Sequence, residues 1–588
     1  MAYGFAPAPA MQDGALFLGL RDDMHRAGIV TPRHLITVAG ARSGKGAALI
    51  IPNLRTWSAG SVLVVDPKGE NAEHTWQQRE AMGHKVYVVD PFMVANVPDR
   101  LRASFNPFDA ILATEQARTA QGRPSVARED IRVLSDGLVM RYKADDATWD
   151  NGAITVIAGM IAHNLSTAPE EYRTLSHVRA VLRMPEDALK PVFEEMAENP
   201  AFGGLAQAAA SVGLSSAKSS REFVKGAQDQ TEWLNADPMR ATLARSDFTL
   251  SELKSGQAAV YLVLPPEYLG EHGRFLRLFV RCAINAMAQG GQGGGKCLFV
   301  LDEFFSLGRI DEIAKAAGLM PSYGVHLWPF LQDLGQLVQL YGNEGAGTFF
   351  GNADAHIFFG NTDPYTLSHI SERLGSVSAD EIGPPPVSSA GLPSGNGEFT
   401  RYMFTGGRRD PHMEGFAAGM NSLNAAGRAF VEMGERKEMA QYQHKAQMLG
   451  RPRLAPEQVR ELVARHTGDS VARSMIAFAT GGAVYNLRLH PYFLPDPVPP
   501  PPPKSLSDQI DSLLSSVSSQ VYFGAAFLAF ILLGRTADSA APVRTFALMV
   551  IAGALTFLGF VRRHEEKQEA AAQIARDKAA PEASPPPP

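Results

Sequence analysis

The feature that most constrains the fold lies in residues 34–54, HLITVAGARSGKGAALIIPNL. An apolar segment ends at Ala39, a loop of small residues follows, and Lys45 stands directly before a second apolar segment. A strand, a small-residue loop, a lysine and a helix in this order bind phosphate, because the loop amides and the positive helix end face the anion while the lysine reaches the outer phosphates. We therefore predict a phosphate-binding loop. The residues expected to contact the nucleotide are Gly40, Ala41, Arg42, Ser43, Gly44, Lys45 and Gly46.

This loop departs twice from the full pattern G-x-x-x-x-G-K-[ST]. Ala39 stands where the first glycine is expected, and Gly46 replaces the hydroxyl residue that normally contacts magnesium. The motif alone is therefore compatible with a chance match as well as with nucleotide binding.

A second motif, residues 297–309 with the sequence CLFVLDEFFSLGR, adds two carboxylates. Five mostly β-prone apolar residues lead into Asp302 and Glu303, which predicts a buried parallel strand with acids at its carboxyl end, where ligands of α/β sheets bind. Asp302 is suited to hold Mg²⁺, and Glu303 to orient or deprotonate an attacking water. Alone, the segment also fits a strand followed by a solvated acidic turn. Together with the lysine loop, it predicts an ATPase that uses ATP and Mg²⁺.

Other polar residues end predicted strands near this site. Asp66 and Asp90 end strands in SVLVVDPKGE and KVYVVDPF, either near the nucleotide or as caps of the following turns. Gln332 ends the strand VHLWPFLQ, which we expect beside the strand that carries Glu303. Its amide would sense the γ-phosphate or the attacking water, or it would be an ordinary cap.

Composition limits the class of protein. The 588 residues are enough for roughly three domains. The 45% apolar and 20% charged residues are typical of a globular chain, and the net charge of −6 does not favour a polyanionic partner for the chain as a whole. Two cysteines, both in apolar surroundings, imply no disulfide framework. The first 20 residues lack the pattern of a signal peptide, so we expect the chain to start in the cytoplasm.

Strand and helix signals divide the chain into parts. The segment GALFLGLR is expected to form a strand beside residues 34–39. We predict an α/β nucleotide-binding domain from residues 1–128 and 246–494, with an inserted all-α domain at residues 129–245. Residues 383–415 are rich in glycine, proline and serine and are expected to form a mobile loop.

The carboxyl-terminal part has a different character. A proline-rich linker is expected at residues 495–512, and two apolar runs within residues 513–561 predict a transmembrane helical hairpin. Each run is shorter than the ~20 residues of a spanning helix, and flanking small residues extend both. Residues 562–588 are expected to be disordered.

Six motifs in this order resemble the VirD4/TraG family of type IV secretion coupling proteins. The motifs are GARSGKG, VVDPKGE, VVDPF, FNPFD, LDEFFSLGRI and LQDLGQL, and the resemblance covers roughly residues 14–495. It implies a RecA-like P-loop NTPase domain with a mostly parallel sheet, an inserted all-α domain and a homo-hexameric ring at the bacterial inner membrane, with the motor in the cytoplasm. It also implies delivery of relaxase-bound single-stranded DNA, or of effector proteins, to the components of a secretion channel. The family usually places its transmembrane segments before the motor, whereas here the candidates follow it.

Two other functions remain open from the residues. In the first, the chain would be an ATPase that moves protein effectors instead of DNA. In the second, it would be a membrane-tethered docking receptor that binds ATP without turnover. The acids Asp302 and Glu303 speak against the receptor, which needs no water-activating carboxylate. In a ring, a neighbouring subunit would supply an arginine finger, for which Arg309 and Arg373 are candidates.

Overall fold

A computed structural model describes residues 5–495, except 32, 141–146, 311–312, 314–317, 379–438, 440–441, 444–445, 466–468 and 470. The loop predicted at 383–415, the apolar runs within 513–561, the tail at 562–588 and all of the linker except Pro495 lie outside the described residues. Within the part that is described, no helix combines the length and the apolar character that a bilayer crossing requires.

One sheet of eleven strands organises the described residues, in the order β2-β1-β11-β10-β9-β3-β8-β7-β4-β6-β5. Its seven parallel strands are β3 (His34–Ala39), β4 (Ser61–Asp66), β5 (Lys85–Val89), β6 (Ala258–Val263), β7 (Cys297–Leu301), β8 (Val325–Leu331) and β9 (Ala353–Phe359). All of them except β5 are buried at every residue, as expected for apolar strands covered on both faces. The predicted α/β fold with a mostly parallel sheet is confirmed.

Four antiparallel strands extend the sheet beyond β9. They are β1 (Leu16–Leu20), β2 (Arg26–Ile29), β10 (Ser474–Ala479) and β11 (Val484–Arg488). The expected placement of β1 beside β3 is wrong, because β1 pairs with β2 and β11. Three strands separate β1 from β3: β11 and β10, from near the end of the globular part, and β9. The pairing partner is set by these long-range contacts, which local alternation does not reveal.

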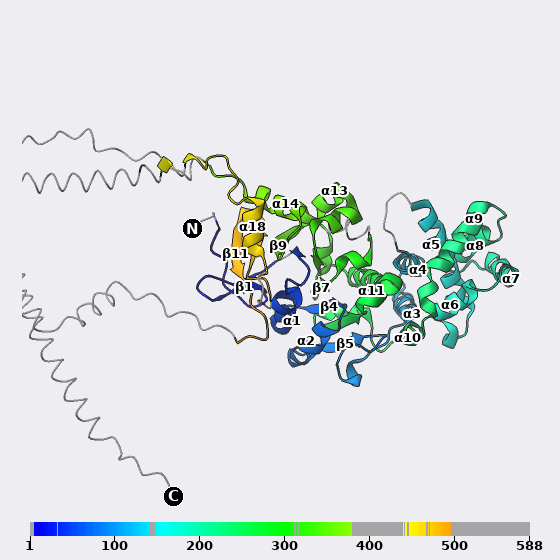
Figure 1. The fold of residues 1–588 in the computed structure, drawn as a ribbon. Coiled ribbons are helices and arrows are strands. Elements are labelled where there is room, and N and C mark those ends of the chain that lie inside the picture. Colours follow the sequence, from blue (N-terminus) through cyan, green and yellow to red (C-terminus); the bar gives the residue numbers. More distant parts are fainter. Residues whose placement is uncertain are drawn as a thin grey trace, which may run out of the picture. The chain divides into compact units, whose positions relative to one another are not determined.

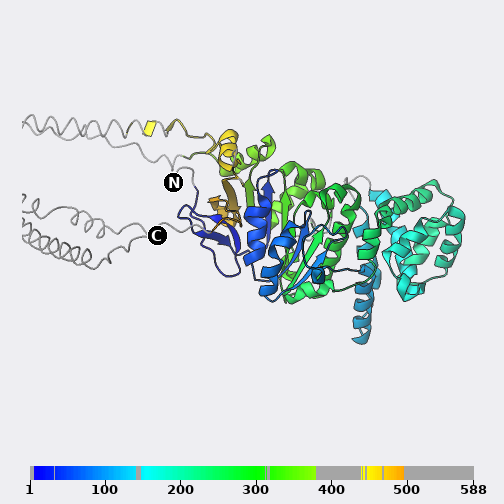
Figure 2. The ribbon, with the colours of Figure 1, turned by 60° about the horizontal axis from the view of Figure 1, so that its bottom comes forward.

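Helices cover both faces of the sheet (Figures 1 and 2). The π-helical turn η1 (Gly46–Ile50), α1 (Ile51–Thr56) and α2 (Glu70–Ala81) pack on one face. The helices α11 (Leu269–Gln289), α13 (Leu334–Asn352), α14 (Pro364–Leu374) and α18 (Pro456–Val463) bury their apolar residues on the other. The short helices around them are η6 (Pro266–Tyr268), η7 (Phe304–Leu307), η8 (Met320–Tyr323) and η10 (Thr480–Gly482).

The described residues between β5 and β6 contain helices and no β-strand. These helices are η2 (Asp99–Leu101), α3 (Pro107–Ala120), α4 (Ala127–Leu138), α5 (Ala147–Thr167), η3 (Glu170–Tyr172), α6 (Leu175–Leu182), α7 (Glu186–Ala197), α8 (Ala201–Gly213), α9 (Lys218–Gln230), η4 (Glu232–Asn235), α10 (Asp237–Thr242) and η5 (Leu250–Ser255). Most of them gather beyond the β5 side of the sheet, far from β1 and β11 (Figure 1). Their buried side chains form one continuous cluster with those of α11 and the sheet.

Candidate nucleotide site

The loop after β3 turns sharply at the edge where the parallel strands end. Arg42 and Gly44 have positive φ angles of 57° and 93°, and the amide of Ser43 donates to the carbonyl of Gly40 over 3.1 Å. The helical turn η1 begins at Gly46, and its first amides have no intrahelical acceptor because no turn precedes them. The buried Oγ of Ser43 has no hydrogen-bond partner among the described residues. The loop therefore presents free donors to an anion.

Residues that follow the loop by more than 300 positions brace it from behind. The amide of Ala472 donates to the Ser43 carbonyl over 2.9 Å, and Arg465 Nη1 donates to the Arg42 carbonyl over 2.8 Å. A Cβ added at Gly40 would overlap the carbonyl oxygen of Gly360, which follows β9. The loop is thus held in its turn by the carboxyl-terminal half of the sheet, which sequence reasoning missed.

The structure brings Lys45 to both predicted acids. Its Nζ lies 2.8 Å from Asp302 Oδ1 and 2.7 Å from Glu303 Oε1. The strand β7, which delivers the acids, is separated from β3 only by β8, so the two motifs end side by side at one sheet edge. Side-chain exposures of 20% for Lys45, 13% for Asp302 and 29% for Glu303 leave the cluster reachable from solvent.

Burial and charge shape the electrostatics of this cluster. Burial opposes the charge of Lys45, but the carboxylates of Asp302 and Glu303 outweigh it and raise the lysine pKa. Burial raises the pKa of Asp302, against the opposing pull of Lys45. Lys45 therefore stays cationic at neutral pH. The negative charge of Asp302 is favoured by the nearby cation, Lys45, and opposed by burial.

Gln332 reaches the same cluster from β8, as predicted. Its side-chain Nε2 donates to Glu303 Oε2 over 3.2 Å, and its backbone amide donates to Gln336 Oε1 over 2.9 Å. Glu303 itself adopts φ 56° and ψ 46°, a left-handed conformation that costs a residue with a side chain about 1–3 kcal/mol. Lys45, Glu303 and Gln332 thus form one chain of contacts.

The two other strand-terminal acids differ in their surroundings. Asp66 ends β4, the neighbour of β7, and burial raises its pKa to about 7, with Asp302 adding to the effect. Its Oδ2 accepts from the amide of Ala72 at the start of α2. Asp90 lies at the end of β5, farther along the sheet, where it pairs with Arg102 at 3.0 Å. Asp66 therefore adjoins the candidate site, whereas Asp90 braces its own turn.

A buried arginine clamps the turn that follows Glu303, and no motif in the sequence signalled it. Arg277 of α11 donates to the carbonyls of Leu307 and Arg309, and its Nη2 lies 3.4 Å from Asp136 Oδ2 on α4. Arg281, one turn further on, lies 3.1 Å from the same carboxylate. The turn is thereby joined to the helices between β5 and β6.

The two arginine-finger candidates both make contacts within their own chain. Arg309 lies over the ring of Tyr341 and donates to the Leu340 carbonyl. Arg373 lies over the ring of Phe478, and its Nη1 donates to His356 over 2.7 Å. Their action on a neighbouring subunit stays a prediction.

The residues present fit a nucleotide with Mg²⁺. Among the described residues, no group of three or more histidine, cysteine or acidic side chains is placed to hold a metal by itself. Mg²⁺ usually keeps several waters and takes one or two carboxylates plus substrate phosphates, so a single acid such as Asp302 is sufficient. A Cβ at Gly46 would meet nothing within 4 Å, so the position lacks a hydroxyl ligand but leaves space for a phosphate.

Curated relatives match much of this chain. VirD4 of Bartonella quintana (strain Toulouse), a type IV secretion system-coupling protein, is 26% identical over 381 residues, or 62% of this chain and 56% of the relative. VirD4 of Agrobacterium fabrum is 27% identical over 354 residues, and the conjugal transfer protein TraG of Escherichia coli is 28% identical over 340. The alignments with these two relatives cover 58% and 52% of this chain, respectively, and 49% of each relative. The chain thus spans about half the length of these relatives.

Solved structures of the plasmid coupling protein TrwB share the fold. The complex with the GTP analogue GDPNP aligns with a TM-score of 0.52 and 12% identity, covering 84% of this chain and 93% of TrwB. The complex with ADP and Mg²⁺ aligns with a TM-score of 0.51 and 13% identity, covering 80% of this chain and 87% of TrwB. The model of the family described as "Type IV secretory system Conjugative DNA transfer" matches residues 9–381. The chain belongs to this family, that of the VirD4/TraG coupling proteins.

Proposed function

We propose that this chain is the ATP-hydrolysing coupling protein of a type IV secretion or conjugation system, which drives relaxase-bound single-stranded DNA across the inner membrane. The observation that carries the proposal is the contact of Lys45 with both Asp302 and Glu303 at one sheet edge. Membership of the family and the match to coupling proteins support the cargo and the channel as partners.

Each residue of the cluster has a role in hydrolysis. Lys45 neutralises the β- and γ-phosphates, and the loop amides hold their oxygens. Glu303 accepts a proton from the attacking water, and Gln332 holds that carboxylate in place and senses the γ-phosphate. Asp302 would hold Mg²⁺, which neutralises charge on the phosphate oxygens when it is bound.

The wider organisation follows the family. The helices between β5 and β6 form an all-α domain inserted into a RecA-like motor. Six copies form a ring at the inner membrane, with the motor in the cytoplasm, and a neighbouring subunit supplies an arginine finger. The turn after Glu303 is clamped to α4 by Arg277, which supports a mechanical link between hydrolysis and the inserted helices.

The test is ATP hydrolysis by the purified full chain, with and without single-stranded DNA. Lys45→Ala and Glu303→Gln should each abolish turnover, whereas Glu344→Gln, an exposed position on α13, should hydrolyse ATP like the wild type. Normal turnover in either site variant would refute the assignment.

Two alternatives have distinct outcomes. If the motor moves protein effectors, crosslinking in cells that make the Glu303→Gln chain will trap protein instead of DNA. If the chain is a docking receptor, it will bind ATP without hydrolysis under every condition, and Glu303→Gln will leave its function in transfer unchanged.

A further inference from the structure

A buried asparagine lies directly behind the phosphate loop. Asn361 follows Gly360 after the end of β9, and it is fully buried. Neither its Oδ1 nor its Nδ2 has a hydrogen-bond partner among the described residues. The large majority of buried side-chain polar atoms in proteins are paired, because an unpaired one has lost its hydrogen bonds to water. Asn361 therefore has hydrogen-bonding capacity that its described surroundings do not use.

The backbone beside Asn361 touches the loop at two points. The amide of Gly40 donates to the Phe359 carbonyl over 3.1 Å. A Cβ added at Gly40 would overlap the Gly360 carbonyl oxygen and would lie 3.4 Å from the amide nitrogen of Asn361. A Cβ added at Gly360 would overlap the Cβ of Ser43. The two glycines thus allow the chains to approach closely, and this brings Asn361 beside the loop.

The loop contains a donor that is already in use. The Ser43 amide donates to the Gly40 carbonyl over 3.1 Å, so it is not available to a phosphate in this conformation. The Oγ of Ser43 is buried and has no partner among the described residues. If the Ser43 amide turns towards an anion, the Gly40 carbonyl loses this donor. Because unpaired backbone carbonyls are costly away from water, a donor beside Gly40 has to replace it.

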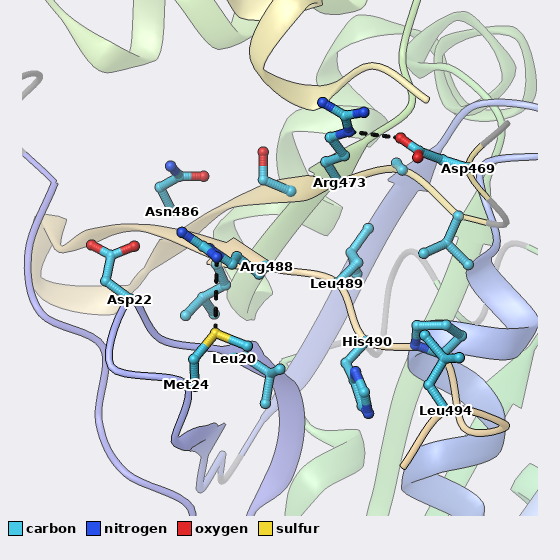
Figure 3. A pocket seen from close by; sticks show the side chains of 15 residues that line it. Leu20, Asp22, Met24, Asp469, Arg473, Asn486, Arg488, Leu489, His490 and Leu494 are labelled. Atoms are coloured by element: carbon cyan, nitrogen blue, oxygen red, sulfur yellow. Dashed lines mark hydrogen bonds and ion pairs between the residues drawn. The ribbon is translucent and has the colours of Figure 1, made fainter. Parts of the chain in front are cut away.

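One support of the loop has space for such a change. The amide of Ala472 donates to the Ser43 carbonyl over 2.9 Å, and a Cβ added at Gly44 would overlap Val471. Val471 and Ala472 also line a cavity of 610 Å³, whose other walls come from the ends of β1 and β11 and the start of β10 (Figure 3). Close-packed interiors resist small shifts, whereas this support borders open space. The loop and its support can therefore move together.

We propose that Asn361 is a positioning residue that holds the loop in its phosphate-bound conformation. Its Nδ2 donates to the Gly40 carbonyl, and its Oδ1 accepts from the Ser43 hydroxyl, once the Ser43 amide has turned to the phosphate. A carboxamide supplies both the donor and the acceptor that this exchange needs. The inference rests on the proposed function, to which it adds a residue on the opposite side of β3 from Gln332.

A leucine substitution tests whether the amide is unused in the nucleotide-free chain. Leucine has the same number of side-chain heavy atoms as asparagine and no polar group, so Asn361→Leu should raise the melting temperature of the full chain. The matched control is Asn53→Leu on α1. Asn53 is also buried, but its amide is bonded to the backbone of Phe17 and Leu49, so the same change should lower the melting temperature.

This comparison has an outcome that overturns the inference. If Asn361→Leu lowers the melting temperature as far as Asn53→Leu does, a water or another group already pairs the amide of Asn361 without nucleotide. The carboxamide would then have no capacity left for the loop.

Ligand binding tests the action on the loop. We expect Asn361→Ala and Asn361→Leu to bind the ATP analogue AMP-PNP, and also inorganic tripolyphosphate, each about tenfold more weakly than the wild type, because both variants lose the carboxamide. Alanine leaves a cavity and should lower the melting temperature, whereas leucine should raise it. Calorimetry of the full chain with Mg²⁺ measures both ligands. Asn96→Ala, at an exposed asparagine beyond β5, should bind them like the wild type.

The outcomes separate this inference from the proposed function. If the wild type binds both ligands and Asn361→Leu binds them equally well, Asn361 does not position the loop, and the phosphate site stands. If affinity follows the melting temperature in the two variants, Asn361 acts by packing and the inference is overturned. A wild-type chain that binds neither AMP-PNP nor tripolyphosphate overturns the proposed function and this inference with it.

Discussion

Arg277 on α11 and Asp136 on α4 form a buried pair, with Nη2 3.4 Å from Oδ2, behind the turn that follows Glu303. The side chain of Arg277 is 1% exposed, and its other donors bind the carbonyls of Leu307 and Arg309. Arg277 therefore contacts both α4 and the turn that follows the candidate catalytic acid. This arrangement connects α4 to the candidate nucleotide site through one guanidinium.

We expect Arg277→Lys to destabilise the chain and to slow turnover. A lysine keeps the charge but cannot bind two carbonyls and a carboxylate at once, so buried acceptors lose their donors, at a cost of about 1–3 kcal/mol. Urea unfolding measures the stability, and steady-state kinetics should show a lower kcat with little change in KM. Arg274→Lys on the same helix, which keeps the clamp intact, is the control. An unchanged kcat in Arg277→Lys would show that the clamp does not position Glu303.

Two glycines of the loop should differ in their response to the same substitution. A Cβ at Gly40 overlaps backbone atoms of Gly360, which cannot swing aside as a side chain does, so Gly40→Ala should cost at least about 1–3 kcal/mol and weaken nucleotide binding. A Cβ at Gly46 meets nothing within 4 Å, so Gly46→Ala should fold like the wild type. Thermal unfolding and AMP-PNP titration compare the pair, and equal effects would contradict the close approach.

Acid should destabilise the fold through His356. Its Nδ1 accepts from Arg373, its Nε2 lies 2.9 Å from the Phe350 carbonyl, and burial together with the arginine charge lowers its pKa to about 4. The unfolded chain binds this proton near pH 6.5, so the stability contributed is complete above that pH and is lost as pH falls toward 4.

The size of this effect follows from the shift. Between pH 7.5 and pH 5 the histidine should account for about 1–2 kcal/mol of lost unfolding free energy. Urea unfolding at both pH values measures it, and His356→Gln should reduce the difference by that amount. A difference of the same size in wild type and variant would show that His356 does not contribute.

Both cysteines should be unreactive in the folded chain. Burial raises the pKa of the Cys282 thiol to about 12, and it raises that of Cys297 as well. Because the thiolate is the reactive form, a thiol reagent at pH 8 should label the native chain slowly and both positions quickly in urea. The two residues are the only cysteines in the sequence, so the number of labels per chain reports on them alone. Cys297 is buried and Cys282 is half-buried, and fast labelling of the native chain would contradict their raised thiol pKa.

Much of the candidate site was predictable because its signals are local. The lysine loop and the acid pair each lie within one strand and the turn after it, and the meeting of parallel strands at a common edge brings Lys45, Glu303 and Gln332 together. Neither the clamp by Arg277 nor the brace of the loop by Ala472 had such a signal. Each depends on residues far apart in the chain whose types are ordinary for helices and loops.

The sequence by itself therefore determined the parallel core, the phosphate loop and the acids that face it, because strand periodicity and turn chemistry are properties of short segments. Only the tertiary structure decided that β1 pairs with β11 rather than with β3, and that the ends of β1, β10 and β11 wall a cavity near the loop. The physical reason is that strand partners are selected by the packing of the whole sheet, which brings together residues hundreds of positions apart in the chain.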